Sequence, residues 1–170
     1  MNYKRLFIQN CLIFITIVTN ERQPILISNI STLKKSVLEV KNFYKFEILA
    51  YCILKDHIHF ILKPDNVIEY PKIIKSFKYS FTKKYKFNNV GLVKPTYKIW
   101  QNRYWEHTIK NENDLNKHID YIHYNSFKHY NISPKNWKYS SFLKFVKNNF
   151  YNIDWCNYED KNNINELNFE

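Results

Sequence analysis

The segment Asp56–Leu62 (DHIHFIL) is the feature that most limits how this chain can fold. Alternate side chains of a β-strand share one face. A strand here would therefore place His57 and His59 together on one side, and apolar residues such as Ile58 and Phe60 on the other. Two neighbouring imidazoles on an otherwise apolar strand need a reason, and a bound metal is the obvious one.

Apolar runs and helix-capping signals outline the other elements. We expect strands over residues 11–19, 46–54, 57–63 and 104–110. We expect helices over residues 31–43, 71–86, 111–126 and 139–150, with the first capped by Ser31 or Thr32, the second started by Pro71 and the third capped by Asn111 or Asn113. A loop over residues 88–99 contains Gly91, the only glycine.

This order of elements, βαββαβ followed by two helices, predicts an α+β fold of the ferredoxin-like sandwich type with an antiparallel sheet. A sheet of this kind carries helices on one face only. We therefore expect the other face, with the histidine pair on it, to be open for a site.

The expected helix over residues 111–126 places a tyrosine on its polar side. Leu115, Ile119 and Ile122 form one apolar stripe, with spacings of four and three residues. Tyr121 lies off this stripe, on a face shared at helical spacings by Asp114, Lys117, Asn125 and Lys128. Nearby lysines would stabilise a phenolate and hold a phosphate. The chain has 14 tyrosines, however, and most of them must be ordinary packing or surface residues.

Charge is spread unevenly along the 170 residues. The formal net charge is +11, but residues 151–170 carry five acidic side chains against Lys161 alone, a net charge of −4. We therefore expect one basic domain over residues 1–150 and an acidic tail over residues 151–170. A basic body with many Tyr and Phe residues fits a nucleic acid partner, although AT-rich codons also favour Lys, Asn, Ile and Tyr. The tail could be an idle solvated end, or it could lie across a basic groove and compete with DNA.

Cysteine usage and hydropathy predict a cytoplasmic protein with no membrane partner. Cys11, Cys52 and Cys156 are odd in number and form no CxxC motif, so we expect free thiols in a reducing compartment. The apolar run Leu12–Val18 is far shorter than the roughly 18 residues of a membrane helix. It is interpreted as a buried strand and not as part of a signal peptide.

Several motifs, taken in order, resemble a known family. His57-Ile58-His59 resembles the histidine–hydrophobe–histidine motif of the HUH single-strand DNA nucleases. The stretches Ile99–His107 and Asp120–Asn125, then Lys128-His129, Trp137 and Ser140–Phe142, resemble the REP-associated tyrosine transposases, relatives of the IS200 and IS605 transposases. The resemblance covers roughly Leu12 to Val146. The family usually has proline where Ser126 stands and glycine where Tyr130 stands. These departures affect where and how the helix ends, and remove no proposed catalytic group.

The resemblance implies a ferredoxin-like catalytic domain that cuts single-stranded DNA near hairpins, as a monomer or homodimer. Tyr121 would be the nucleophile and would form a bond to the 5′ phosphate, releasing a 3′ hydroxyl. His57, His59 and Asn125 would hold a divalent metal, Mg²⁺ or Mn²⁺, with the imidazoles slightly favouring Mn²⁺. The i, i+4 spacing of Tyr121 and Asn125 independently supports the assignment of Asn125.

Other side chains are candidates for contacts with DNA. Those expected to reach the DNA are Lys75, Lys78, Lys83, Arg103, Lys128 and His107. Each lysine taken singly could be a solvated surface residue, and His107 could be a structural histidine. Exposed Tyr79 and Tyr104 could stack on unpaired bases, whereas Trp105 and Trp137 are expected in the core. His118, His123 and His129 are interpreted as surface residues or residues beside the site.

Three other functions stay open on the sequence. The first is a non-catalytic nucleic-acid-binding module, because ferredoxin-like sheets with basic helices often bind RNA. The second is a nuclease that uses metal-activated water, which would leave free ends and no protein–DNA adduct. The third is a host-adopted descendant that still cleaves DNA but no longer moves it.

Overall fold

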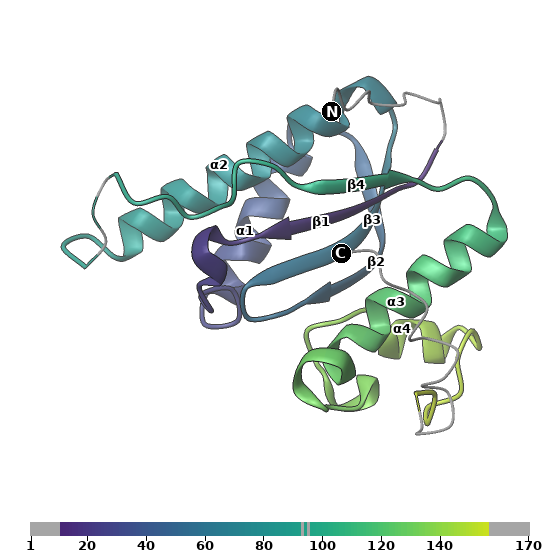
Figure 1. The fold of residues 1–170 in the computed structure, drawn as a ribbon. Coiled ribbons are helices and arrows are strands. Elements are labelled where there is room, and N and C mark those ends of the chain that lie inside the picture. Colours follow the sequence, from purple (N-terminus) through teal and green to yellow (C-terminus); the bar gives the residue numbers. More distant parts are fainter. Residues whose placement is uncertain (1–10, 93, 95, 157–170) are drawn as a thin grey trace.

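The computed structural model describes residues 11–92, 94 and 96–156. Four strands form one antiparallel sheet in the order β2-β3-β1-β4 (Figure 1). Their bounds are β1 Ile13–Val18, β2 Phe46–Ile53, β3 His57–Pro64 and β4 Trp105–Thr108. The order and pairing confirm the predicted α+β class and are consistent with the ferredoxin-like arrangement.

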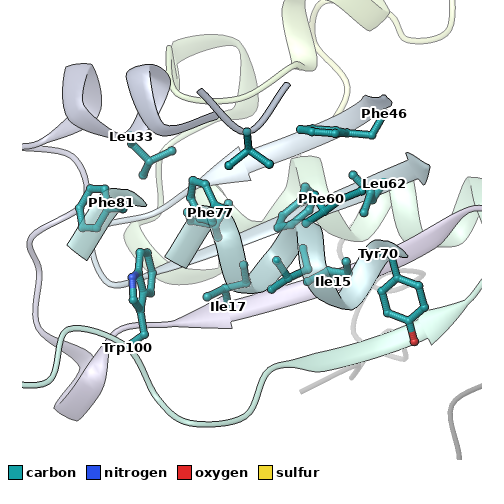
Figure 2. Close-up of a cluster of buried hydrophobic side chains, with 14 of the residues drawn as sticks. Ile15, Ile17, Leu33, Phe46, Phe60, Leu62, Tyr70, Phe77, Phe81 and Trp100 are labelled. Carbon is teal, nitrogen blue, oxygen red and sulfur yellow. The ribbon is translucent and has the colours of Figure 1, made fainter. Parts of the chain in front are cut away.

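Two helices cover one face of the sheet and enclose the main core. They are α1, Ile30–Lys41, and α2, Tyr70–Asn88. Ile15 and Ile17 of β1 and Phe60 and Leu62 of β3 point toward these helices, where they meet residues such as Phe77 (Figure 2). The period-two alternation of β3 therefore buries its apolar residues as the sequence predicted.

The second face of the sheet is partly covered, which corrects the expectation of an open face. Helix α3, Glu112–Tyr130, packs there and is followed by the short helix α4, Phe142–Lys147. A second buried cluster joins Phe14 and Ile61 of the sheet to Ile122 of α3 and Phe142 of α4. Since α3 carries apolar residues toward the sheet, it covers part of this face as a third layer, while Thr16, Val18 and His57 on the same face line a cleft.

The third helix starts and ends at residues with clear local causes. Asn111 is the N-cap, and its Oδ1 accepts a hydrogen bond from the Asp114 backbone N–H at 2.9 Å. The helix continues past Ser126 to Tyr130, one turn beyond the expected end, because Ser126 can continue a helix where proline would not. Asn131 then adopts the left-handed conformation with φ 54°, the role that glycine commonly fills.

The segment after α3 is less helical than expected. Instead of one helix over residues 139–150, the structure has a 3₁₀ turn at Pro134–Asn136 and the six-residue helix α4. Residues 139–141 pair with the outer edge of β2: Ile53 N donates to Tyr139 O at 2.9 Å, and Ser141 N to Tyr51 O at 2.9 Å. These ladder bonds hold the backbone extended and postpone the helix.

Other elements are short. Two further 3₁₀ turns cover Asn20–Arg22 and Val67–Glu69. Strand β4 is shorter than the expected 104–110, since only four of its residues pair with β1.

Cys11, Cys52 and Cys156 are free cysteines, as predicted. Beyond residue 150, Tyr151 and Cys156 are still buried, so the fold continues into the predicted tail; residues 157–170 lie outside the described part. No helix among the described residues combines the length and apolar character needed to cross a bilayer.

Candidate active site

The histidine pair lies on the face of β3 that meets α3. His57 is opposite Val18 of β1 in the sheet register, and His59 is opposite Thr16. Both side chains are buried, and the centroids of their rings are 4.9 Å apart. The expectation that alternation would bring these two imidazoles together on one face is therefore met, but under α3 and not on an open surface.

Hydrogen bonds from neighbouring side chains fix the orientation of both rings. Thr16 Oγ1 lies 2.8 Å from His59 Nδ1, and Asp56 Oδ1 lies 2.7 Å from His57 Nδ1. Asp56 is held in turn by Arg22, whose Nη1 donates to Asp56 Oδ2 at 3.3 Å. A carboxylate or hydroxyl on one ring nitrogen is the usual way in which proteins orient a metal-binding histidine. In both rings the nitrogen suited to a metal would be Nε2.

Burial and charge set the protonation of His59. Burial lowers the pKa of His59 well below its usual value, and the positive charges of His57, His129 and Lys128 lower it further, while a hydrogen bond with Asn125 opposes them. His59 is therefore a neutral imidazole, the form that binds metals. Burial raises the pKa of Asp56, but interactions with His57 and Arg22 outweigh it, so the net pKa is below the ordinary value.

Helix α3 brings Tyr121 and Asn125 to the histidines. The ring of Tyr121 lies 5.3 Å from that of His59, centroid to centroid. Asn125, one turn later, donates from Nδ2 to the Tyr121 backbone oxygen at 2.6 Å, which directs its Oδ1 away from the helix backbone. Lys128 places its Nζ 5.1 Å from the centre of the Tyr121 ring.

The position of Tyr121 corrects one expectation. Sequence phase placed it on an exposed polar face, but the structure buries the whole side chain. Its ring packs edge-on against Phe14 of β1, with centroids 6.0 Å apart. Burial extends round most of this part of α3. Every residue from His118 to Ser126 is buried except the half-buried Asp120, because the helix contacts the sheet on one side and the segment around α4 on another.

Three histidines that were interpreted as surface residues or residues beside the site have different surroundings. His118 and His123 are fully buried, which excludes a surface role. His129 is on the exposed end of α3, and its ring lies 4.8 Å from that of His57. The sequence contained a signal for His129, since it is four residues after Asn125 and eight after Tyr121, on the same helical face.

A cleft of about 320 Å³ adjoins His57 on the same face of the sheet, where Thr16 and Val18 also line it. Arg22, Gln101, Arg103 and Trp105 line it, so it combines two guanidinium groups with an aromatic wall. Trp105 was expected in the core, but 39% of it is exposed, since β4 is a short edge strand. Phe14 holds its ring edge-on with centroids 5.4 Å apart.

The other residues predicted to contact DNA are scattered. Lys75 and Lys83 are exposed on α2, across the sheet from the histidine pair, so the structure does not bring them to this centre. Lys78 is half-buried, and its Nζ donates to the Gln101 backbone oxygen at 2.6 Å beside the cleft. Burial, followed by the charge of Lys98, lowers the pKa of Lys78.

His107 bonds to Asp114 on α3, with 2.8 Å between Nε2 and Oδ2. The roles of these residues in DNA binding therefore stay predictions.

The residues present fit a divalent cation. His57, His59 and Asn125 would supply two imidazole Nε2 atoms and one carboxamide oxygen, all three of them buried atoms. The Nδ1 bonds to Asp56 and Thr16 point those nitrogens inward, as a metal site requires. Such a set leaves coordination positions for phosphate oxygen and water.

Comparison with known proteins agrees with this geometry. Residues 7–125 match the family model described as IS200-like transposase. A REP-associated tyrosine transposase of Escherichia coli K12 is 31% identical over 157 residues, covering 91% of this chain and 90% of its own length. A Haemophilus influenzae relative that provisionally bears the same name is 38% identical over 162 residues, covering 91% and 92%.

A solved structure extends the likeness to three dimensions. The structure of a REP-associated tyrosine transposase bound to a REP hairpin has a TM-score of 0.81 to this chain and 30% identity, with 92% of each chain covered. The relatives and the solved structure agree over about nine tenths of the chain, and the family model covers residues 7–125 of it. The chain therefore belongs to the IS200-like transposases and, within them, to the REP-associated tyrosine transposases.

Proposed function

We propose that this transposase cuts and rejoins single-stranded DNA near hairpins through a covalent bond between Tyr121 and a 5′ phosphate. The observation that carries the proposal is a convergence from three separate segments. Strand β3 supplies His57 and His59, and α3 supplies Tyr121 and Asn125 within ring-contact distance of them. Strand β1 supplies Thr16, which orients His59.

In the proposed reaction the Tyr121 oxygen attacks the scissile phosphorus. A bond forms between this oxygen and phosphorus, and the bond from phosphorus to the 3′ oxygen breaks. The phenol proton passes to solvent, and the leaving oxygen takes up a proton to become a 3′ hydroxyl. The phosphotyrosine bond keeps the energy of the phosphodiester, so the 3′ hydroxyl of another strand can reverse the step and join the DNA.

The side chains around Tyr121 suit this chemistry. A divalent ion bound by His57, His59 and Asn125 would polarise the phosphate oxygen and stabilise the charge that develops on it. Lys128 adds a positive charge over the tyrosine ring, where an incoming phosphate would meet it. Arg22 and Asp56 keep His57 in one orientation throughout.

The path of the DNA follows from burial and charge. Since the Tyr121 side chain is buried, a strand can reach its hydroxyl only when the groups over it move apart. The cleft next to His57 is a ready site for the adjoining nucleotides. Arg22 and Arg103 would contact phosphates there, and the exposed face of Trp105 would stack on an unpaired base. The hairpin itself is proposed as the partner because the solved relative is bound to one.

The test is adduct formation on hairpin oligonucleotides with single-stranded flanks. The protein is incubated with labelled DNA and Mn²⁺ or Mg²⁺ and analysed on denaturing gels. We expect a protein–DNA adduct in the wild type and none in Tyr121→Phe. Tyr124→Phe is the matched control, because Tyr124 is a buried tyrosine on the same helix that packs in a different cluster, and it should form adducts as the wild type does.

Each alternative outcome has a distinct meaning. Adducts that persist in Tyr121→Phe would show that another residue is the nucleophile. Cleavage to free ends with no adduct would indicate attack by water. Hairpin binding with no cleavage under any metal would indicate a binding module. Size-exclusion chromatography with and without DNA would test the expectation of a monomer or homodimer.

A further inference from the structure

A second group of metal-ligating side chains joins β4 to the start of α3. His107 comes from β4, Asp114 from the first turn of α3, and His118 from the next turn. Their ligand atoms all lie within 4.8 Å of one another. Among the described residues, no other set of three His, Cys, Asp or Glu side chains comes this close together.

We propose that His107, Asp114 and His118 bind a divalent transition-metal ion of the Zn²⁺ class, at a site distinct from the candidate active site. Two imidazoles and one carboxylate are a common three-ligand set for such ions, with water in the fourth position. The inference concerns binding only, and it does not depend on the proposed DNA cleavage.

The three side chains are close enough to reach one ion after small rotations. His107 Nε2 lies 2.8 Å from Asp114 Oδ2, and His118 Nδ1 lies 3.1 Å from Asp114 Oδ1. Ligands around a tetrahedral zinc ion with bonds of about 2.0–2.1 Å lie about 3.3 Å apart. The two imidazole rings are nearly parallel, with a 12° interplanar angle and centroids 4.7 Å apart. The carboxylate therefore already bridges the two rings, and one of the stacked rings would have to turn for both nitrogens to face the same ion.

The carboxylate is pre-oriented by its own backbone contacts. Lys110 N donates to Asp114 Oδ2 at 2.9 Å, and Asn111 caps the helix at the Asp114 N–H. Burial raises the pKa of Asp114, but hydrogen bonds from His107 and Lys110 outweigh it, so the net pKa lies below the ordinary value. A charged and fixed carboxylate loses little freedom when it binds a cation.

Metal binding requires an exchange of partners, in which the bonds from His107 Nε2 and His118 Nδ1 to the Asp114 carboxylate give way to bonds to the ion. His118 Nδ1 also lies 2.8 Å from the Asp114 backbone oxygen, and a metal on this nitrogen would replace that contact. The cost is limited, since a helical carbonyl still accepts the N–H four residues later. Solvent access is sufficient for exchange, because the side chains of His107 and Asp114 are 26% and 19% exposed.

Phe14 separates the two sites. Its ring lies 4.8 Å from that of His118 on one side and 5.9 Å from that of His59 on the other. An ion at His107, Asp114 and His118 would thus bridge the edge strand and the helix that carries Tyr121 without contacting Tyr121. Its effect would be to fix the start of α3 against the sheet.

The experiment measures Co²⁺ binding to the full chain after treatment with a chelator. The background is His57→Ala/His59→Ala, which removes the candidate active site. We expect this background to bind one Co²⁺ per chain by calorimetry, with visible d–d absorption and displacement by Zn²⁺. Adding His107→Ala, or separately Asp114→Asn, should weaken binding at least 100-fold. His129→Ala is the matched control on a histidine outside the group and should leave binding unchanged.

The outcomes separate this proposal from the proposed function. Circular dichroism confirms that each variant is folded, and His107 is a safe target because it is part-exposed on an edge strand. Absence of Co²⁺ binding in the background, or binding that survives both His107→Ala and Asp114→Asn, overturns the second site. Wild type and background that each bind one ion would support this site while refuting metal binding at His57 and His59.

Discussion

Acidification should destabilise this protein through a histidine on the far side of α3. His123 is fully buried between α3 and α4, with Nε2 2.8 Å from Ser141 Oγ and rings of Phe142, Phe145 and Tyr151 around it. Burial lowers its pKa from 6.5 to about 3. In the unfolded chain the imidazole returns to its ordinary pKa, so the two states differ in bound protons.

The sign and size of the effect follow from that difference. Because the folded pKa is the lower one, the stability is complete above pH 6.5 and is lost as the pH falls toward 3. Between pH 7.5 and 5.5 the unfolded imidazole gains most of a proton and the folded one gains almost none. This costs about 1.4 kcal/mol of unfolding free energy. This free-energy difference depends little on the pKa of His123 in the folded state, because pH 5.5 is well above that pKa.

The assay is urea unfolding followed by circular dichroism at pH 7.5 and 5.5. His123→Gln should lose about 1.4 kcal/mol less than the wild type over this interval, because glutamine takes up no proton. Phe145→Leu perturbs the same contact without a titrating group, so it should lower stability equally at both pH values. If the wild type and His123→Gln lose the same unfolding free energy from pH 7.5 to 5.5, within about 0.3 kcal/mol, the assignment of His123 as a buried neutral base is refuted.

Three further changes test other features of the structure. Asn131→Ala should lower the unfolding free energy by about 1 kcal/mol, whereas Asn131→Gly should not, because residue 131 has φ 54°; thermal unfolding measures both. Asp56→Asn should weaken Mn²⁺ affinity about 10–100-fold by calorimetry in a His107→Ala background, because Asp56 orients His57; an unchanged affinity would show that this contact is dispensable. Trp105→Ala should weaken binding of single-stranded DNA by about 1–3 kcal/mol in fluorescence anisotropy, while Phe43→Ala, exposed near α1, should have no effect.

The sheet was largely predictable, because its signals are local. Period-two alternation in β3 and β-branched residues in β1 suffice to define which side chains share a face. That is why His57 and His59 could be paired from the sequence. The capping residue Asn111 was also within reach, since its side chain bonds only three residues away.

The surroundings of α3 were not predictable in the same way. Helical phase distinguishes one buried stripe from the rest, but α3 contacts the sheet on one side and the α4 segment on another. Tyr121 is therefore buried although it lies off the apolar stripe, and His118 and His123, which border the stripe, are buried too. The prediction for Trp105 was wrong in the opposite direction. Its hydrophobicity predicts burial, but its position on an edge strand leaves it partly exposed.

The order of strands has a consequence for how this enzyme family could lose activity. The histidines belong to β3, an interior strand paired on both sides, whereas Tyr121 belongs to a helix attached through side-chain packing. A lineage that lost or displaced the tyrosine would keep the whole sheet, the two paired imidazoles and the arginine-lined cleft. Under the proposed mechanism, loss of the Tyr121 hydroxyl alone would therefore end cleavage and leave the architecture intact.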